Sequence, residues 1–133
     1  MKFLDTNVIV RYLTGDDPRK ARQCAQLFER VQGGREAVYT TAMAVAEVVW
    51  VLGTRYGHPK ANIVEGLRRV LNTSQILFEE RETLLMAVDL FERHAIDFID
   101  AYHGAVMLAR GTSDIYSYDT DFDHVAGLRR LEP

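Results

Sequence analysis

Apolar residues along the chain alternate between short β-prone runs and longer stretches with helical spacing. The short runs predict strands at 2–4, 37–40, 75–78, 114–118 and 128–131. The longer stretches predict helices at 8–13, 17–33, 42–56, 59–71, 80–94 and 99–110, several of them bounded by capping residues, proline or glycine. This alternation is typical of an α/β fold with a mostly parallel central sheet and helices on both of its faces.

The third helical stretch is the most hydrophobic, and Glu47 is the only charged residue between positions 42 and 52. A carboxylate on a mostly buried helix is normally paired, protonated or bound to a cation, because burying it alone is costly. Two other readings remain open. Glu47 could lie on a narrow exposed stripe, or it could pair with an arginine such as Arg11.

Other acids stand where parallel strands end or helices begin. Asp5 and Asp119 each follow a predicted strand, and the carboxyl ends of parallel strands share one edge of a sheet, where ligands collect. Asp100 stands three residues after Asp97, so it could instead serve the first turn of a helix that Asp97 caps. Capping is also a local explanation for Asp5. Each of these acids therefore has a structural explanation as well as a functional one.

Carboxylates that converge raise one another's pKa values unless a cation offsets their charge, so a shared site predicts a metal ion. Oxygen ligands suit magnesium or manganese, whereas zinc would need paired histidines or cysteines that the sequence lacks. Asp119, Asp121 and Asp123 also follow the spacing of a calcium loop. That reading fails, since His124 replaces the required glycine and Arg130 stands where the bidentate glutamate belongs.

Length and composition indicate one domain, residues 1–133, with ordinary globular proportions. Cys24 is the only cysteine, which excludes an internal disulfide and fits a reducing cytoplasm. We find no signal peptide and no apolar run long enough to span a membrane. The net charge of −3 does not exclude a nucleic-acid partner, because four acids gathered in one metal site would leave −3 + 4 = +1 for the remaining surface.

Four segments of the chain together resemble the PIN-domain family, and within it the VapC-type toxins of prokaryotic toxin–antitoxin pairs. The segments are Phe3-Leu4-Asp5-Thr6-Asn7, Glu47 in the third helical stretch, Ile99-Asp100-Ala101 and Ser117-Tyr118-Asp119-Thr120-Asp121-Phe122. Each is short, but their order and spacing extend the resemblance over essentially the whole chain.

The resemblance implies a Rossmann-like fold and a metal-dependent endoribonuclease that acts on single-stranded RNA. By motif match, Asp5, Glu47, Asp100 and Asp119 are the expected catalytic acids. Asp121 is a further candidate for the metal, and its choice over Asp119 stays open. Polar positions expected to support the site are Thr6, Asn7 and Ser117. In the hypothesis that follows, Mg²⁺, or Mn²⁺ in its place, activates a water molecule that attacks the phosphodiester, and Glu47 binds or orients that water.

The same resemblance implies three partners: an RNA substrate, an antitoxin protein and a second copy of the chain. The apolar third helix favours such interfaces, although its side chains could also simply complete the core. Within the family reading, a free-standing RNA-processing nuclease, a DNA-directed nuclease and a catalytically silent binding module remain alternatives. Phosphoryl transfer on Asp5 is disfavoured, because the nearby acid is replaced by Asn7 and the second half of the chain has no lysine.

Overall fold

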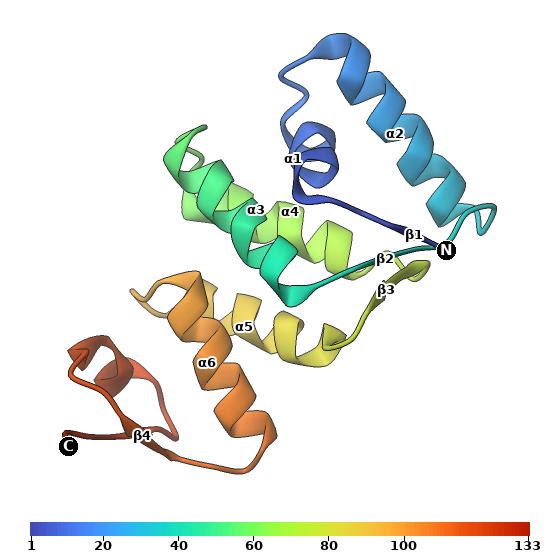
Figure 1. Ribbon diagram of the computed structural model, residues 1–133. Helices are drawn as coiled ribbons and strands as arrows, with labels where there is room; N and C mark the ends of the chain where they lie inside the picture. Colours follow the sequence, from blue (N-terminus) through green and yellow to red (C-terminus); the bar gives the residue numbers. More distant parts are fainter. The chain divides into compact units, whose positions relative to one another are not determined.

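A computed structural model describes all 133 residues and divides the chain into two compact units, Met1–Arg81 and Glu82–Pro133. We call them unit 1 and unit 2 and describe each by itself (Figure 1). None of the helices combines the length and apolar character that crossing a membrane requires.

Unit 1 consists of three parallel strands and four helices. Its elements are β1 (Lys2–Phe3), α1 (Thr6–Thr14), α2 (Pro18–Gln32), β2 (Val38–Thr40), α3 (Ala42–Thr54), α4 (Lys60–Leu71) and β3 (Ile76–Phe78). The strand order is β1-β2-β3, with Phe3 beside Tyr39 and Tyr39 beside Leu77. Side chains alternate along these strands, so Val38 and Ile76 are buried whereas Phe3, Tyr39 and Leu77 are exposed.

Helix packing in unit 1 follows the apolar stripes of the sequence. α1 packs against both α2 and α3, and α3 packs against α4 (Figure 1). The rings of Tyr12 and Phe28 stack at 3.8 Å between α1 and α2. The core of this unit therefore lies where the apolar faces of α1, α3 and α4 meet the buried side of the strands.

Unit 2 holds two helices, two strands and a short 3-10 helix. They are α5 (Arg81–Arg93, which starts on the last residue of unit 1), α6 (Phe98–Ala109), β4 (Asp114–Tyr116), η1 (Thr120–His124) and β5 (Arg129–Leu131). β4 and β5 are parallel neighbours, tied by a bidentate ion pair between Asp114 and Arg129. Phe91 and Phe98 pack edge to face between α5 and α6, with ring centroids 5.8 Å apart.

The prediction of an α/β fold with parallel strands is confirmed, and each predicted helix and strand is present within a few residues of its expected bounds. The strands are divided between two sheets, three in unit 1 and two in unit 2. The apolar pattern indicates which residues form strands, but it does not determine which strands pair.

Candidate metal centre and the two groups of acids

Asp5 follows β1 after a single residue, Leu4, whose backbone is hydrogen-bonded to β2. The Leu4 amide donates to the Tyr39 carbonyl at 2.8 Å, and the buried Thr40 hydroxyl donates to the Leu4 carbonyl at 2.8 Å. Asp5 then begins α1 with extended backbone, yet its carboxylate makes no capping hydrogen bond. The capping explanation for this acid is therefore not realised, and its exposed side chain is available for another role.

Thr6 connects Asp5's helix to Glu47. Its buried hydroxyl lies 3.4 Å from the Ala44 carbonyl and 3.3 Å from the Glu47 Oε2, as donor to both. Asp5, Thr6, Asn7 and Glu47 all line one recess between α1 and α3. Unit 1 thus brings together four of the residues that the sequence singled out.

The expectation that Glu47 is buried is wrong, because its side chain is exposed. α3 turns Val45, Val48 and Leu52 into the core and leaves Met43, Glu47 and Trp50 on an outer stripe at helical spacing. A helix that is apolar all round has more apolar surface than one contact with the core can cover. The apolar sequence of α3 therefore predicted a deeper burial of Glu47 than the structure shows. The exposed stripe was the open alternative for this residue.

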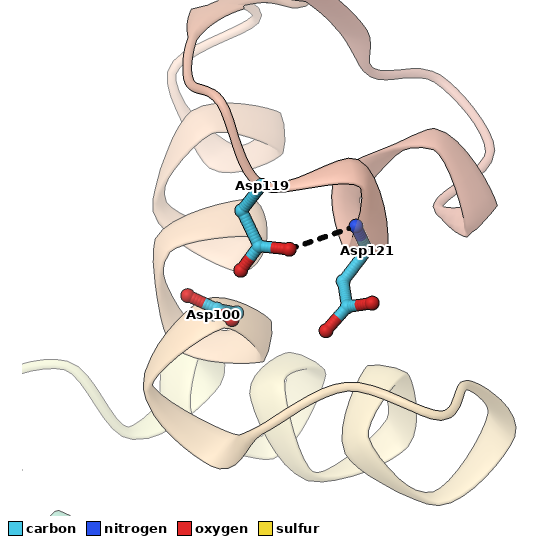
Figure 2. A group of neighbouring side chains, drawn as sticks. All are labelled: Asp100, Asp119 and Asp121. Atoms are coloured by element: carbon cyan, nitrogen blue, oxygen red, sulfur yellow. Dashed lines mark hydrogen bonds between the residues drawn. The ribbon is translucent and has the colours of Figure 1, made fainter.

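Unit 2 gathers the other acids. Asp100, Asp119 and Asp121 each offer a carboxylate oxygen within 4.8 Å of the others. Figure 2 shows Asp100 on α6, Asp119 just before η1 and Asp121 on η1, with their carboxylates turned toward a common space. A buried Phe122 anchors η1 to the core between Asp121 and the next acid along the chain.

Local hydrogen bonds hold Asp119 in place. Its backbone amide donates to the Ser117 hydroxyl at 2.9 Å, and its Oδ1 accepts from the Asp121 amide at 2.9 Å (Figure 2). Ser117 itself is fixed by a hydrogen bond from its amide to the Leu131 carbonyl at 3.0 Å. One oxygen of Asp119 is thus used within the turn, and the Ser117 hydroxyl holds the backbone amide of Asp119.

Asp123 is separated from this group by an ion pair. Arg130 Nε lies 3.0 Å from Asp123 Oδ1, and the same arginine also bonds Glu132 and the Ser117 carbonyl. The residue that ruled out a calcium loop in the sequence therefore pairs with the third acid of that motif. Sequence reasoning missed this role, although an arginine seven residues after an aspartate was a visible signal.

The electrostatics of unit 2 favour a cation. Burial raises the pKa of Asp100 above its ordinary value, the negative charge of Asp119 raises it further, and Asp97 and Asp121 add to the effect against a small opposing influence of His103. Asp97 caps α6 by position without a side-chain hydrogen bond, so Asp100 is the third helical residue as expected. All the donors in the group are carboxylate oxygens, the ligand type that suits Mg²⁺ and Mn²⁺.

A family model described as the PIN domain matches residues 2–128. The chain belongs to the PIN domain family. The match includes residues of both units, among them the five candidate site acids Asp5, Glu47, Asp100, Asp119 and Asp121.

Two similar proteins both carry the name VapC. A VapC ribonuclease from Aquifex aeolicus (strain VF5) is 23% identical over 133 residues, which cover 100% of this chain and 97% of that protein. Among solved structures, the crystal structure of Mycobacterium tuberculosis VapC20, described as a sarcin-ricin loop cleaving toxin, has 23% identity and a TM-score of 0.41, with 100% of both chains covered.

Proposed function

We propose that this PIN domain is a divalent-metal-dependent endoribonuclease that hydrolyses RNA phosphodiester bonds as the toxin of a type II toxin–antitoxin pair. The observation that carries the proposal is the gathering of Asp100, Asp119 and Asp121 in a chain of the PIN domain family. The likeness to a VapC ribonuclease over nearly the full length of both chains supports the toxin role.

In this proposal Asp100, Asp119 and Asp121 hold the cation, for which we choose Mg²⁺ with Mn²⁺ as a substitute. The raised pKa of Asp100 supports the assignment. Burial and the neighbouring acids disfavour the ionised form of this carboxyl, and a nearby cation would stabilise that form. A divalent ion at such a site supplies Lewis acidity and positive charge for phosphodiester hydrolysis.

We assign Asp5 and Glu47 to the same reaction, with the chain of 133 residues acting as one PIN domain. Support comes from the family match, which includes both units, and from the Asp5 carboxylate, which is free of a capping role. By the family resemblance, Asp5 would be a further metal-binding acid. Glu47 accepts a hydrogen bond from the attacking water and orients it, while the Thr6 hydroxyl fixes the other side of that carboxylate.

The proposed partners are RNA, an antitoxin and a second copy of the chain, in the cytoplasm. Met43 and Trp50 support an interface at α3, because their side chains are 83% and 59% exposed on a helix with few polar residues. Size-exclusion chromatography with light scattering tests the homodimer, and a protomer-sized mass at micromolar concentration would contradict it.

The activity is tested with a labelled single-stranded RNA oligonucleotide and its DNA counterpart. We expect cleavage of RNA with Mg²⁺ or Mn²⁺, none with EDTA, and none by Asp100→Asn. The matched control is Asp123→Asn, which changes a neighbouring acid that pairs with Arg130. Cleavage that persists in EDTA or in Asp100→Asn would overturn the proposal, cleavage of DNA alone would redirect it, and no cleavage with intact metal binding would indicate a silent binding module.

A further inference from the structure

The recess between α1 and α3 has a second end, away from its acids. It has a volume of about 210 Å³, and beyond the residues already described it is lined by Val10, Arg11, Val51, Arg55 and Tyr56. Val10 is buried and Val51 is half-buried, so these two side chains form an apolar floor. The charged side chains lie around this floor, acids at one end and arginines at the other.

The arginines repeat along both helices in the same direction from the acids. On α1, Arg11 stands six residues after Asp5, which occupies the N-cap position, and at the end of α3, Arg55 stands eight residues after Glu47, with Val51 midway. At about 1.5 Å of rise per residue, these spacings correspond to roughly 9 and 12 Å along the helix axes. Both arginines therefore lie about two helical turns beyond the acids along their helices.

Tyr56 closes the basic end and is itself held in position. Its hydroxyl donates to Asp16 Oδ2 at 2.5 Å, which joins the end of α3 to the loop between α1 and α2. The residue is 36% exposed, and its ring meets that of His58 edge to face, with ring centroids 5.9 Å apart. A partly exposed ring that is fixed at one end provides a surface on which a planar group can stack.

Arg11 retains hydrogen-bonding capacity despite a contact with Asp16. One of its terminal nitrogens lies 3.4 Å from Asp16 Oδ1, a long contact to a carboxylate that also receives the Thr14 and Tyr56 hydroxyls. A guanidinium has five N–H donors, and its fork matches the oxygens of a phosphate. The side chain is half-buried, so it would lose less conformational entropy when it binds a ligand.

We propose that Arg11 and Arg55 bind backbone phosphates of the RNA next to the bond that is cut, and that a flanking base stacks on Tyr56. The inference rests on the proposed function and names how that site holds its substrate. A nucleic-acid strand needs positive charge beside an acidic centre, because its phosphates are otherwise repelled by the carboxylates. The structural alternative is that both arginines merely complement the negative ends of α1 and α3, near which they stand.

The test measures binding to a fluorescent single-stranded RNA in EDTA, by anisotropy, from low to moderate salt. The variants are Arg11→Gln and Arg55→Gln, and the matched control is Arg22→Gln, which removes an exposed arginine of α2 outside the recess. We expect each recess variant to bind about 5- to 20-fold more weakly at low salt, with a salt slope shallower by roughly 0.7 per lost contact. The control should stay within twofold of the original chain.

Tyr56 is tested by two substitutions that separate its ring from its hydroxyl. Tyr56→Phe should keep the affinity for RNA, whereas Tyr56→Leu should lower it several-fold, because only the leucine variant lacks a stacking surface. Thermal melting of every variant distinguishes the structural alternative. A lower Tm with unchanged RNA affinity in the arginine variants, or an affinity of the original chain no greater than that of the Arg11→Gln/Arg55→Gln double variant, would overturn the inference.

Failure of this inference is distinguishable from failure of the proposed function. Metal-dependent cleavage with the same KM in the original chain and the double variant would leave the function standing and remove the phosphate contacts. RNA binding that depends on Arg11 and Arg55 in a chain that never cleaves RNA would do the reverse. If both hold, the double variant should show a raised KM with little change in kcat.

Discussion

The two units carry acids in opposite electrostatic settings. In unit 2, Asp100, Asp119 and Asp121 lie within 4.8 Å of one another, and burial with neighbouring negative charge raises the pKa of Asp100. In unit 1, Asp5 and Glu47 share a recess with Arg11 and Arg55. The cluster in unit 2 attracts a cation, whereas the recess in unit 1 is lined by both negative and positive groups.

This difference suggests a division of work within one reaction. A concentrated set of carboxylates is suited to hold a divalent ion, whereas a recess with both charges is suited to position a phosphate and a water molecule. The same residue type therefore has a different task in each unit, and substitutions that neutralise single acids should affect metal affinity and turnover to different extents.

A large effect on the cleavage rate is expected for Asp119→Asn. Because one oxygen of Asp119 is used within its turn and the other is left for the cation, loss of the charge should slow RNA cleavage by about 100-fold or more. Asp123→Asn should stay within a few-fold, since Arg130 already pairs with that acid and exposed pairs contribute little. Single-turnover rates of the two variants measure the contrast, and equal losses would remove Asp119 from the site.

A smaller effect separates the units by metal affinity. Asp121→Asn should weaken Mn²⁺ binding by about 10-fold in calorimetric titration, because it removes one charged oxygen from the group of three in unit 2. Glu47→Gln should change the affinity by less than that while still slowing cleavage. A larger loss of Mn²⁺ affinity in Glu47→Gln than in Asp121→Asn would reverse the assignment of roles.

Thr6→Val probes the link between α1 and Glu47. The substitution keeps the shape of a buried side chain and removes the hydroxyl that Glu47 Oε2 accepts from. Loss of one such hydrogen bond, worth about 1 kcal/mol, should lower kcat roughly 5-fold without changing Mn²⁺ affinity. An unchanged kcat would show that Glu47 needs no such support.

The smallest effect concerns stability without metal. A carboxyl whose pKa is raised by folding stabilises the fold while protonated, and this contribution is lost as the pH rises through the folded-state pKa. Asp100→Asn should therefore raise Tm at pH 7 in EDTA, by about 1 to 2 °C after solvent screening, and the gain should vanish at pH 3.

Asp114→Asn provides the control of opposite sign. A hydrogen bond from Arg129 lowers the pKa of Asp114, so its ionised form stabilises the fold above the unfolded-state pKa and that stabilisation is lost as the pH falls. This variant should lower Tm at pH 7, as measured in the same melting experiment. A shift of the same sign in both variants would contradict the contrast between paired and unpaired acids.

The sequence predicted the elements well because apolar spacing, capping residues and glycine stops agreed along the chain. Asp17 accepts from the Lys20 amide and Thr41 accepts from the Ala44 amide, so local rules set where α2 and α3 begin. The gathering of Asp100 with Asp119 and Asp121 was expected from the resemblance to the PIN-domain family, whereas each acid by itself also had a local structural explanation.

Other features could not be predicted, because they depend on packing that no local sequence pattern determines. The exposure of Glu47 follows from which side of α3 meets the core, and the sequence of an apolar helix does not mark that side. The recess with Arg11 and Arg55 depends on the approach of α1 to α3, although the spacing of these arginines from Asp5 and Glu47 was already visible in the sequence. The sequence thus did not predict which distant elements approach one another.

The most direct test of the account is whether acids of both units are needed for one activity. Asp5→Asn and Asp100→Asn are compared with the original chain in Mn²⁺-stimulated cleavage of a single-stranded RNA, with circular dichroism to confirm folding. We predict that each variant stays folded and loses cleavage. Full activity retained in either variant would contradict the claim that both groups of acids serve the same reaction.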